Sequence, residues 1–261
     1  MNVIVMAGTH DAVRIMEKLS DFEDIKILAT TTTDYGAELA RSAGASDVIS
    51  RGLPSEKIVE IIDERSINVL VDATHPFAVE ATKNAIKAVH KTGIKYLRFE
   101  RPQIPLPESE IVYKVRSFED AASKALEIAN EDVNRRIMHL AGVSTLHYLT
   151  ERVKPERIIA WVVPSIFSIK KCLETGLPGG NIIAMQGTFS KDFNSAMMKE
   201  YNVSAVVTKE SGETGGTPEK VEAALELGIP VVVVMRPEVA ELKNEWVSGD
   251  VDAICRKLRC L

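Results

Sequence analysis

Short apolar runs alternate along this chain with segments whose apolar residues recur every three or four positions. The runs are typical of strands buried on both faces, and the spaced positions are typical of amphipathic helices. The first hundred residues predict strands at 3–7, 25–30, 47–49, 68–71 and 95–99, with helices at 35–42 and 55–65 and helices that begin at residues 11 and 76. Such alternation indicates βαβ units and a parallel sheet.

A second alternation of predicted strands and helices follows a segment with three prolines, Pro102, Pro105 and Pro107. It predicts strands at 112–115, 137–140, 158–163, 182–185, 205–208 and 231–235, and helices at 117–129, 190–199 and 252–258 and from residues 165 and 217. We therefore predict an α/β protein with two Rossmann-like domains, parallel sheets and an interdomain cleft. The predicted boundaries are 1–102 for the first domain, 103–111 for a linker and 112–261 for the second domain.

Composition and charge argue against several classes of protein. The 261 residues carry a formal net charge of −5 and only 5% aromatic residues, which argues against a nucleic-acid binder. The longest apolar run, 229–235, is far shorter than a membrane span requires. Three cysteines (Cys172, Cys255 and Cys260) lack metal-ligand spacing, and the five histidines form no H-x-x-x-H pattern. We expect a cytoplasmic protein with reduced thiols and no bound metal.

Residues 68–78 bring a strand end, a polar turn and a helix start together within eleven positions. Asp72 ends the apolar run, and Pro76 begins a helix with apolar residues every four positions. In open α/β sheets, ligands bind outside the carboxyl ends of the strands. The turn Asp72-Ala73-Thr74-His75 therefore predicts one wall of a ligand site. His75 is either a donor that faces the ligand or a structural residue, and the pattern leaves both roles open.

Two turns of the first half suit a nucleotide. Gly8-Thr9 follows the first strand and allows backbone to approach a phosphate, although the G-x-G-x-x-G fingerprint is absent. The run Thr30 to Thr33 follows the second strand, where the adenosine ribose of a dinucleotide binds. An acidic residue here favours NADH, and hydroxyl groups with a nearby arginine favour the 2′-phosphate of NADPH. Asp34 and Arg41 both follow the threonines, so the choice between the two nucleotides stays open.

A glycine-rich loop in the second half suits an anion. Residues 209–220 hold Gly212, Gly215 and Gly216 between Lys209 and Lys220. Glycines free the backbone to form an anion-binding nest, and a lysine in the first turn of a helix opposes the helix dipole. The loop therefore favours an anionic ligand, and the alternative is a flexible surface loop.

Several stretches together resemble the precorrin-6A reductase family of cobalamin biosynthesis. They extend across residues 3–237 and comprise Gly8-Thr9, residues 72–78 (Asp-Ala-Thr-His-Pro-Phe-Ala), residues 96–102 (Tyr-Leu-Arg-Phe-Glu-Arg-Pro), residues 186–190 (Gln-Gly-Thr-Phe-Ser), residues 208–212 (Thr-Lys-Glu-Ser-Gly) with Gly215, Gly216 and Lys220, and Arg236-Pro237. The resemblance implies NADPH or NADH as the hydride donor and a corrinoid substrate, with hydride added to C19 and a proton to C18. It implies a nucleotide-binding first domain and a substrate-binding second domain, in a monomer or homodimer.

The resemblance and the turns together assign the site residues. Cofactor contacts are expected at Gly8, Thr9, Thr31, Thr32, Thr33, Asp72, Ala73 and Thr74. Substrate contacts are expected at His75, Arg98, Arg101, Gln186, Lys209, Ser211, Gly212, Gly215, Gly216, Lys220 and Arg236, because basic residues pair with the acetate and propionate groups of a corrin precursor. Candidates for catalysis are Asp72, His75 and Lys209, and water is an equal candidate for the proton donor.

Two alternatives to a reductase remain at the level of sequence. A non-catalytic two-domain binder of an anionic metabolite would use the same domains and the same anion nest. A tetrapyrrole methyltransferase would need a glycine-rich cofactor loop, which the sequence lacks.

Overall fold

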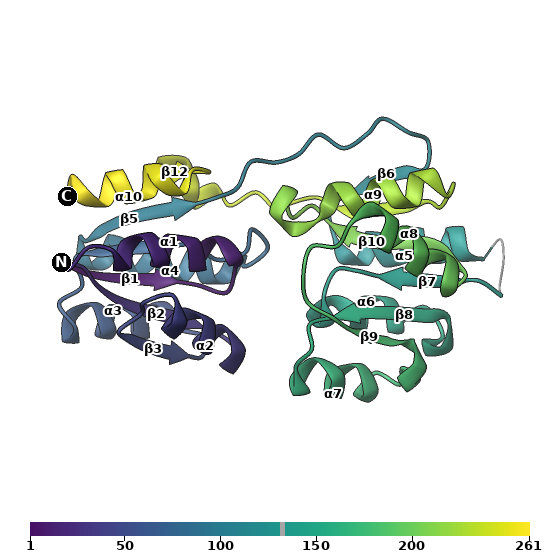
Figure 1. Cartoon of the computed structure of the whole chain (residues 1–261), viewed down its shortest axis with the longest axis horizontal. Helices are drawn as coiled ribbons and strands as arrows, with labels where there is room; N and C mark the ends of the chain where they lie inside the picture. Colours follow the sequence, from purple (N-terminus) through teal and green to yellow (C-terminus); the bar gives the residue numbers. More distant parts are fainter. Residues whose placement is uncertain (131–133) are drawn as a thin grey trace. The chain divides into compact units, whose positions relative to one another are not determined.

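The computed structural model describes residues 1–130 and 134–261 and consists of two compact units (Figure 1). Unit 1 comprises Met1–Pro102 and Pro237–Leu261, and unit 2 comprises Gln103–Arg236. Each unit contains a six-stranded sheet in which every neighbouring pair of strands is parallel. The predicted α/β fold with two Rossmann-like domains is confirmed, and the cleft between them stays a prediction.

The sheet of unit 1 has the strand order β12-β5-β4-β1-β2-β3. Its strands are β1 (Asn2–Met6), β2 (Lys26–Thr31), β3 (Asp47–Ser50), β4 (Val69–Asp72), β5 (Lys95–Phe99) and β12 (Trp246–Ser248). The chain reverses direction across the sheet between β1 and β4, which is the switch point where doubly wound sheets bind ligands. The loops after β1 and β4 therefore meet at the edge where ligands are expected.

Helices cover both faces of the first sheet. They are α1 (His10–Ser20), α2 (Asp34–Ser42), α3 (Ser55–Glu64), α4 (Val79–Thr92) and α10 (Val251–Arg259). Val3 and Val5 pack in one core with residues of α1, α2 and α10, whereas Ile4 packs in the other with residues of α3 and α4. Alternate residues of a strand face opposite sides of the sheet, and both sides are covered here. This is why β1 is apolar at every position from Val3 to its end.

Unit 2 repeats this topology with the order β6-β11-β10-β7-β8-β9. Its strands are β6 (Val112–Val115), β7 (Arg136–His139), β8 (Ile158–Val162), β9 (Ile182–Ala184), β10 (Val203–Lys209) and β11 (Val231–Val234). Its helices are α5 (Phe118–Ala129), α6 (Leu146–Thr150), α7 (Ile166–Glu174), α8 (Lys191–Glu200) and α9 (Thr217–Glu226). The switch point lies between β7 and β10, so the loop that follows Lys209 lies at the ligand edge of the second sheet.

The domain boundary differs from the prediction at the C-terminal end. Residues 237–261 belong to unit 1 and not to the second domain. Trp246 pairs with Leu97 of β5, and α10 buries Ile254 and Leu258 in the core beside α1 (Figure 1). The physical reason is that the first five strands leave β5 at an open edge, which β12 covers. A pattern read along the chain cannot indicate which sheet a distant strand completes.

The predicted linker and one predicted helix start also differ in detail. Residues 103–111 belong to unit 2, where Leu106 joins the core. The helix expected from Pro76 begins at Val79, because residues 76–77 form a turn first. Ser55 and Thr217 are residue types that favour the N-cap position, but they are the first residues of α3 and α9. The caps are Pro54 and Gly216, since both hydroxyl groups bond elsewhere. The helix α6 and the strand β12 were not predicted.

Candidate functional site

The loop after β1 presents backbone to the ligand edge of unit 1. Gly8 is exposed, has a φ of +119°, and has no atom within 4 Å of the position that a Cβ would occupy. The hydroxyl of Thr9 accepts a hydrogen bond from the Ala12 amide at 3.1 Å and donates one to the Ala73 carbonyl at 2.9 Å. Thr9 therefore joins the two loops of the switch point, and the open backbone at Gly8 is the part that suits a phosphate.

The threonine run lies beside this loop. The Ala7 amide donates to the Thr30 carbonyl at 2.8 Å, which holds the ends of β1 and β2 together. Thr31 is buried and donates its hydroxyl to the Thr33 carbonyl, and the Thr33 hydroxyl caps α2 by accepting from the Gly36 amide at 3.0 Å. Thr32 and Thr33 are exposed. The structure thus places the predicted nucleotide residues of both turns at one sheet edge.

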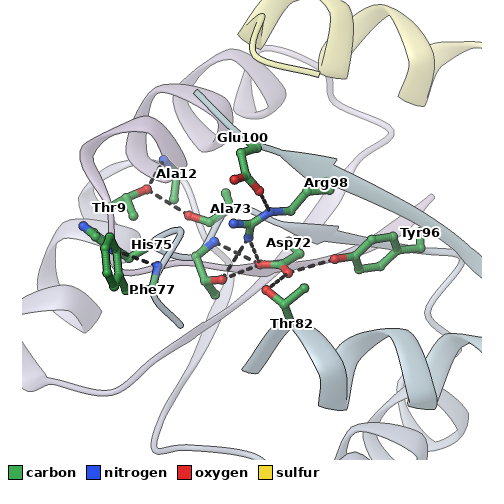
Figure 2. A network of polar contacts seen from close by, with 11 residues as sticks. Thr9, Ala12, Asp72, Ala73, His75, Phe77, Thr82, Tyr96, Arg98 and Glu100 are labelled. Atoms are coloured by element: carbon green, nitrogen blue, oxygen red, sulfur yellow. Dashed lines mark hydrogen bonds and ion pairs between the residues drawn. The ribbon is translucent and has the colours of Figure 1, made fainter. Parts of the chain in front are cut away.

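Asp72 is the centre of a buried polar network (Figure 2). Its Oδ1 accepts hydrogen bonds from the Thr74 amide at 3.0 Å, the Thr74 hydroxyl at 2.7 Å and Nη1 of Arg98 at 2.8 Å. Its Oδ2 accepts from the hydroxyl groups of Thr82 at 2.7 Å and Tyr96 at 2.9 Å. Asp72 is fully buried, so this saturated carboxylate orders the loop after β4 instead of meeting a ligand directly.

The charges of this network hold one another in the ionised form. Burial alone would raise the pKa of Asp72, but the guanidinium of Arg98 and the donors of Thr74 and Thr82 lower the pKa below its ordinary value. Burial alone would lower the pKa of Arg98, and the carboxylates of Asp72 and Glu100 raise it. Burial and the charge of Asp72 raise the pKa of Tyr96, which stays a neutral hydrogen-bond donor.

Arg98 was predicted to contact substrate, and its burial favours a positioning role. Its side chain is 2% exposed and forms ion pairs with Asp72 at 2.8 Å and with Glu100 at 3.1 Å. Arg101 pairs with the buried carboxylate of Asp11 at 2.6 Å. The two arginines therefore connect β5 and the residues after it to the end of β4 and to the first turn of α1.

His75 lies in the turn that precedes α4. Its Nδ1 accepts a hydrogen bond from the Phe77 amide at 3.2 Å, and the two rings lie 5.7 Å apart (Figure 2). The bond fixes the ring against the turn, and it explains why residues 76–77 turn before the helix begins. His75 is half-buried at the end of the loop after β4.

A second carboxylate and arginine pair holds the ligand edge of unit 2. Glu210 is fully buried, forms an ion pair with Arg236, and accepts a hydrogen bond from the Gly212 amide at 2.9 Å. The Thr217 hydroxyl accepts from the Ser211 amide at 3.0 Å and donates to the Lys209 carbonyl. The pair fixes the start of the glycine-rich loop, so Arg236 contacts Glu210 where a contact with substrate was predicted.

The rest of this loop packs closely beside Lys220: Gly212 and Gly216 are buried, and a Cβ at Gly216 would lie 3.1 Å from the methyl group of Thr188. Gly212 and Gly216 have φ values of +73° and +68°, which side chains rarely adopt. The Lys220 ammonium donates to the Gly215 carbonyl at 2.9 Å, and burial lowers its pKa. Thr188 donates to the Thr214 carbonyl at 3.2 Å, so the exposed loop that contains Gln186 lies next to the glycine-rich loop.

The predicted residues thus form two groups, one at the ligand edge of each sheet. Sequence reasoning missed several polar partners: the buried Asp11, Thr82, Tyr96, His139 and Glu210, and the half-buried Glu100. A usable signal was present for Tyr96 and Arg98, which stand two residues apart in an apolar strand and so share one face. No such signal exists for Thr82, whose contact with Asp72 depends on how α4 packs.

His139 is a buried histidine at the ligand edge of unit 2. It ends β7, is fully buried, and its Nε2 lies 3.1 Å from the Gly142 carbonyl. Burial lowers the pKa of His139 to about 4; the nearby charge of Lys209 acts in the same direction, and the bond to Gly142 opposes both. His139 is therefore neutral near pH 7, and its ring anchors the loop after β7.

Two kinds of site are absent from the part of the chain that the structure describes. There, no group of three or more His, Cys, Asp or Glu side chains is placed to hold a metal ion. Among those same residues, no helix has the length and apolar character that crossing a bilayer requires.

Comparisons with known proteins identify the family. Residues 2–259 match the family model described as precorrin-6x reductase CbiJ/CobK. A relative from Methanothermobacter thermautotrophicus named cobalt-precorrin-6A reductase is 48% identical over 97% of this chain and 82% of its own length. A relative of the same name from Methanocaldococcus jannaschii is 42% identical over 92% of both chains.

The fold agrees with this result. The solved structure named CobK precorrin-6A reductase superposes with a TM-score of 0.77 at 19% identity and covers 100% of this chain and 97% of its own. The family model and the two relatives cover nearly the whole chain. The chain therefore belongs to the precorrin-6x reductase family CbiJ/CobK, a family of oxidoreductases of cobalamin biosynthesis.

Proposed function

We propose that this protein uses NADPH or NADH to reduce one ring double bond of cobalt-precorrin-6A, with hydride added to C19 and a proton to C18. The observation that carries the proposal is the 48% identity over 97% of the chain to a cobalt-precorrin-6A reductase. The name of that relative favours the cobalt-containing substrate over metal-free precorrin-6A. A bound nicotinamide nucleotide would supply the hydride.

Unit 1 is the proposed nucleotide domain. The open backbone at Gly8 and the start of the eleven-residue helix α1 fit a pyrophosphate, because amide groups and the helix dipole favour an anion there. The exposed hydroxyl groups of Thr32 and Thr33 fit the ribose end. Asp72 acts indirectly in this proposal, since it orders the loop that holds Ala73 and Thr74.

Unit 2 is the proposed substrate domain. A corrin precursor carries many carboxylates, and the glycine-rich loop offers the cations of Lys209 and Lys220. The amides of Ser211, Gly212, Gly215 and Gly216 donate hydrogen bonds within the protein, so the lysines carry this part of the proposal. Lys220 has three N–H donors, and one of them is directed to Gly215. An acidic protein can attract a polyanion through such a local field although its net charge is −5. Water or His75 is the proposed source of the proton.

The deciding experiment is anaerobic mixing of the protein with cobalt-precorrin-6A and either nucleotide. The proposal expects loss of the reduced nicotinamide absorbance together with a change in the corrinoid spectrum. Comparing NADPH with NADH at equal concentration gives the nucleotide preference. Binding of the corrinoid without turnover with either nucleotide would refute the reductase and support a non-catalytic binder.

Replacing Gly8 by valine is expected to weaken binding of the reduced nucleotide by about tenfold or more. A residue with a Cβ is strained at this φ by about 1–2 kcal/mol, and its side chain would fill the space above the loop. Gly93→Val is the matched control, since Gly93 also has a positive φ and open space but ends α4, away from the loop. Fluorescence titration with NADPH and NADH measures the effect, and equal affinities in both variants would contradict the assignment.

Replacing Lys220 by methionine is expected to raise the KM for the corrinoid by about 10- to 100-fold. The reason is that a hydrogen bond to a charged group contributes about 1.5–3 kcal/mol. The control is Lys191→Met, which removes an exposed lysine of α8 that pairs with Glu226 at 2.9 Å. Steady-state kinetics with each substrate varied in turn measure the effect. An equal rise in the KM for the nucleotide would contradict the division of roles between the units.

A further inference from the structure

The loop between β8 and α7 presents apolar side chains to solvent at the ligand edge of unit 2. Val163 is 50% exposed, Ile166 is 88% exposed and Phe167 is 67% exposed. Ser165 caps α7 by accepting a hydrogen bond from the Ser168 amide at 3.1 Å, which fixes Ile166 and Phe167 in the first turn. Clustered exposed apolar side chains of this kind mark binding surfaces.

The equivalent loop of unit 1 is more polar. The sheets share one strand order, so β8 of unit 2 occupies the place that β2 occupies in unit 1. After β2 the chain presents the exposed residues Thr32, Thr33 and Asp34 before the half-exposed Tyr35, whereas after β8 it presents Val163, Ile166 and Phe167. This position in the fold is therefore mostly polar in the proposed nucleotide domain and more apolar in the other unit.

The apolar loop lies at the same sheet edge as the proposed carboxylate-binding loop. In the strand order, β7 separates β8 from β10, and neighbouring strands are about 4.8 Å apart, so the ends of β8 and β10 are about 10 Å apart. Lys209 ends β10, and Lys220 follows in the first turn of α9. The edge of unit 2 thus combines a cationic side with an apolar side.

We infer that Val163, Ile166 and Phe167 form an apolar platform for the face of the corrin macrocycle, while the loop of Lys209 and Lys220 binds the carboxylates at its rim. A corrin precursor has this amphipathic character, with an apolar ring system and carboxylate side chains around it. The inference rests on the proposed function and adds specificity to it. The platform selects a macrocycle over small polycarboxylates, which have no apolar face.

The test measures affinity for cobyrinic acid, a cobalt corrin with seven free carboxyl groups, in the absence of nucleotide. Phe167→Ser and Ile166→Ser are each expected to weaken its binding by about 10- to 100-fold, because each removes an apolar contact that ligand binding would bury. Both residues are exposed, so folding should tolerate the changes, which circular dichroism and thermal unfolding check. Affinity for NADPH should not change.

The matched control is Leu173→Ser on the same helix. Leu173 is 53% exposed but lies two turns farther from the ligand edge, so its replacement should leave the affinity for cobyrinic acid unchanged. Equal losses of affinity for cobyrinic acid in all three variants, or no loss in Phe167→Ser and Ile166→Ser, would refute the platform. The reductase assay with the unmodified protein would still succeed in that case. Failure of that assay would instead refute the proposed function.

Sedimentation velocity of the same variants tests whether a second copy of this chain, instead of the corrin, covers the apolar surface. If the unmodified protein is a dimer that Phe167→Ser dissociates without loss of affinity for cobyrinic acid, the apolar surface is an interface between copies and the inference is wrong. An unchanged sedimentation coefficient together with a weaker affinity for the corrin supports the platform.

Discussion

Replacing Asp72 by alanine is expected to lower the free energy of unfolding of unit 1 by about 3–5 kcal/mol, because it removes the fully buried carboxylate of the two that pair with the buried charge of Arg98. Thr82 and Tyr96 would also lose the carboxylate that accepts their hydroxyl groups. Urea unfolding measures the change. The chain has two tryptophans, Trp246 in unit 1 and Trp161 in unit 2, so Trp246 fluorescence in a Trp161→Phe background reports on unit 1 alone.

An exposed pair in the same unit provides the control for Asp72. Asp47 and Arg65 lie 3.2 Å apart, and each side chain is about half exposed. Asp47→Ala should therefore cost less than about 1 kcal/mol. A loss below about 1 kcal/mol for Asp72→Ala as well would show that the network of Asp72 does not hold unit 1 together.

The stability of unit 2 is expected to fall by about 2 kcal/mol when the pH is lowered from 7 to 5, through His139 alone. The pKa of His139 is about 4 in the folded protein against 6.5 for the ordinary side chain. The unfolded chain therefore binds more protons between these values, so the contribution is complete above about pH 6.5 and is lost as the pH falls toward 4.

Urea unfolding at a series of pH values, followed by Trp161 fluorescence in a Trp246→Phe background, measures how the free energy of unfolding of unit 2 depends on pH. His139→Gln should reduce this dependence, since glutamine does not titrate. His90→Gln, a change to an exposed histidine of unit 1, should leave it as it is. The same pH dependence in His139→Gln as in the unmodified protein would show that another group of unit 2 is responsible.

The two units fix their ligand edges by the same physical means. In unit 1 the carboxylate of Asp72 at the end of β4 pairs with Arg98 on the neighbouring strand β5. In unit 2 the carboxylate of Glu210 follows β10 and pairs with Arg236, which follows the neighbouring strand β11. Each pair is buried and bonded to loop amides, so it specifies the loop conformation more than it adds stability. We expect ligand contacts at the open backbone of Gly8 and at more accessible side chains.

The fold class and most of the helices and strands can be predicted from local patterns in the sequence. Buried parallel strands need continuous apolar runs and the helices between them need one apolar face, so both are visible along the chain. Ser117, Ser165 and Ser190 begin their helices as caps, because a hydroxyl that accepts from the first turn is a local signal. The glycine turns at the sheet edges were visible for the same local reason.

Which polar residues are buried, and what they bind, depends on contacts that form only in the folded chain. Arg98 looks like a free cation in sequence, and it is saturated because strand pairing brings Asp72 beside it. The assignment of 237–261 to unit 1 depends on which sheet edge β12 covers, and a short strand carries no signal for that choice. Both outcomes depend on contacts between residues far apart in the chain, whereas periodicity and caps record only contacts between near neighbours.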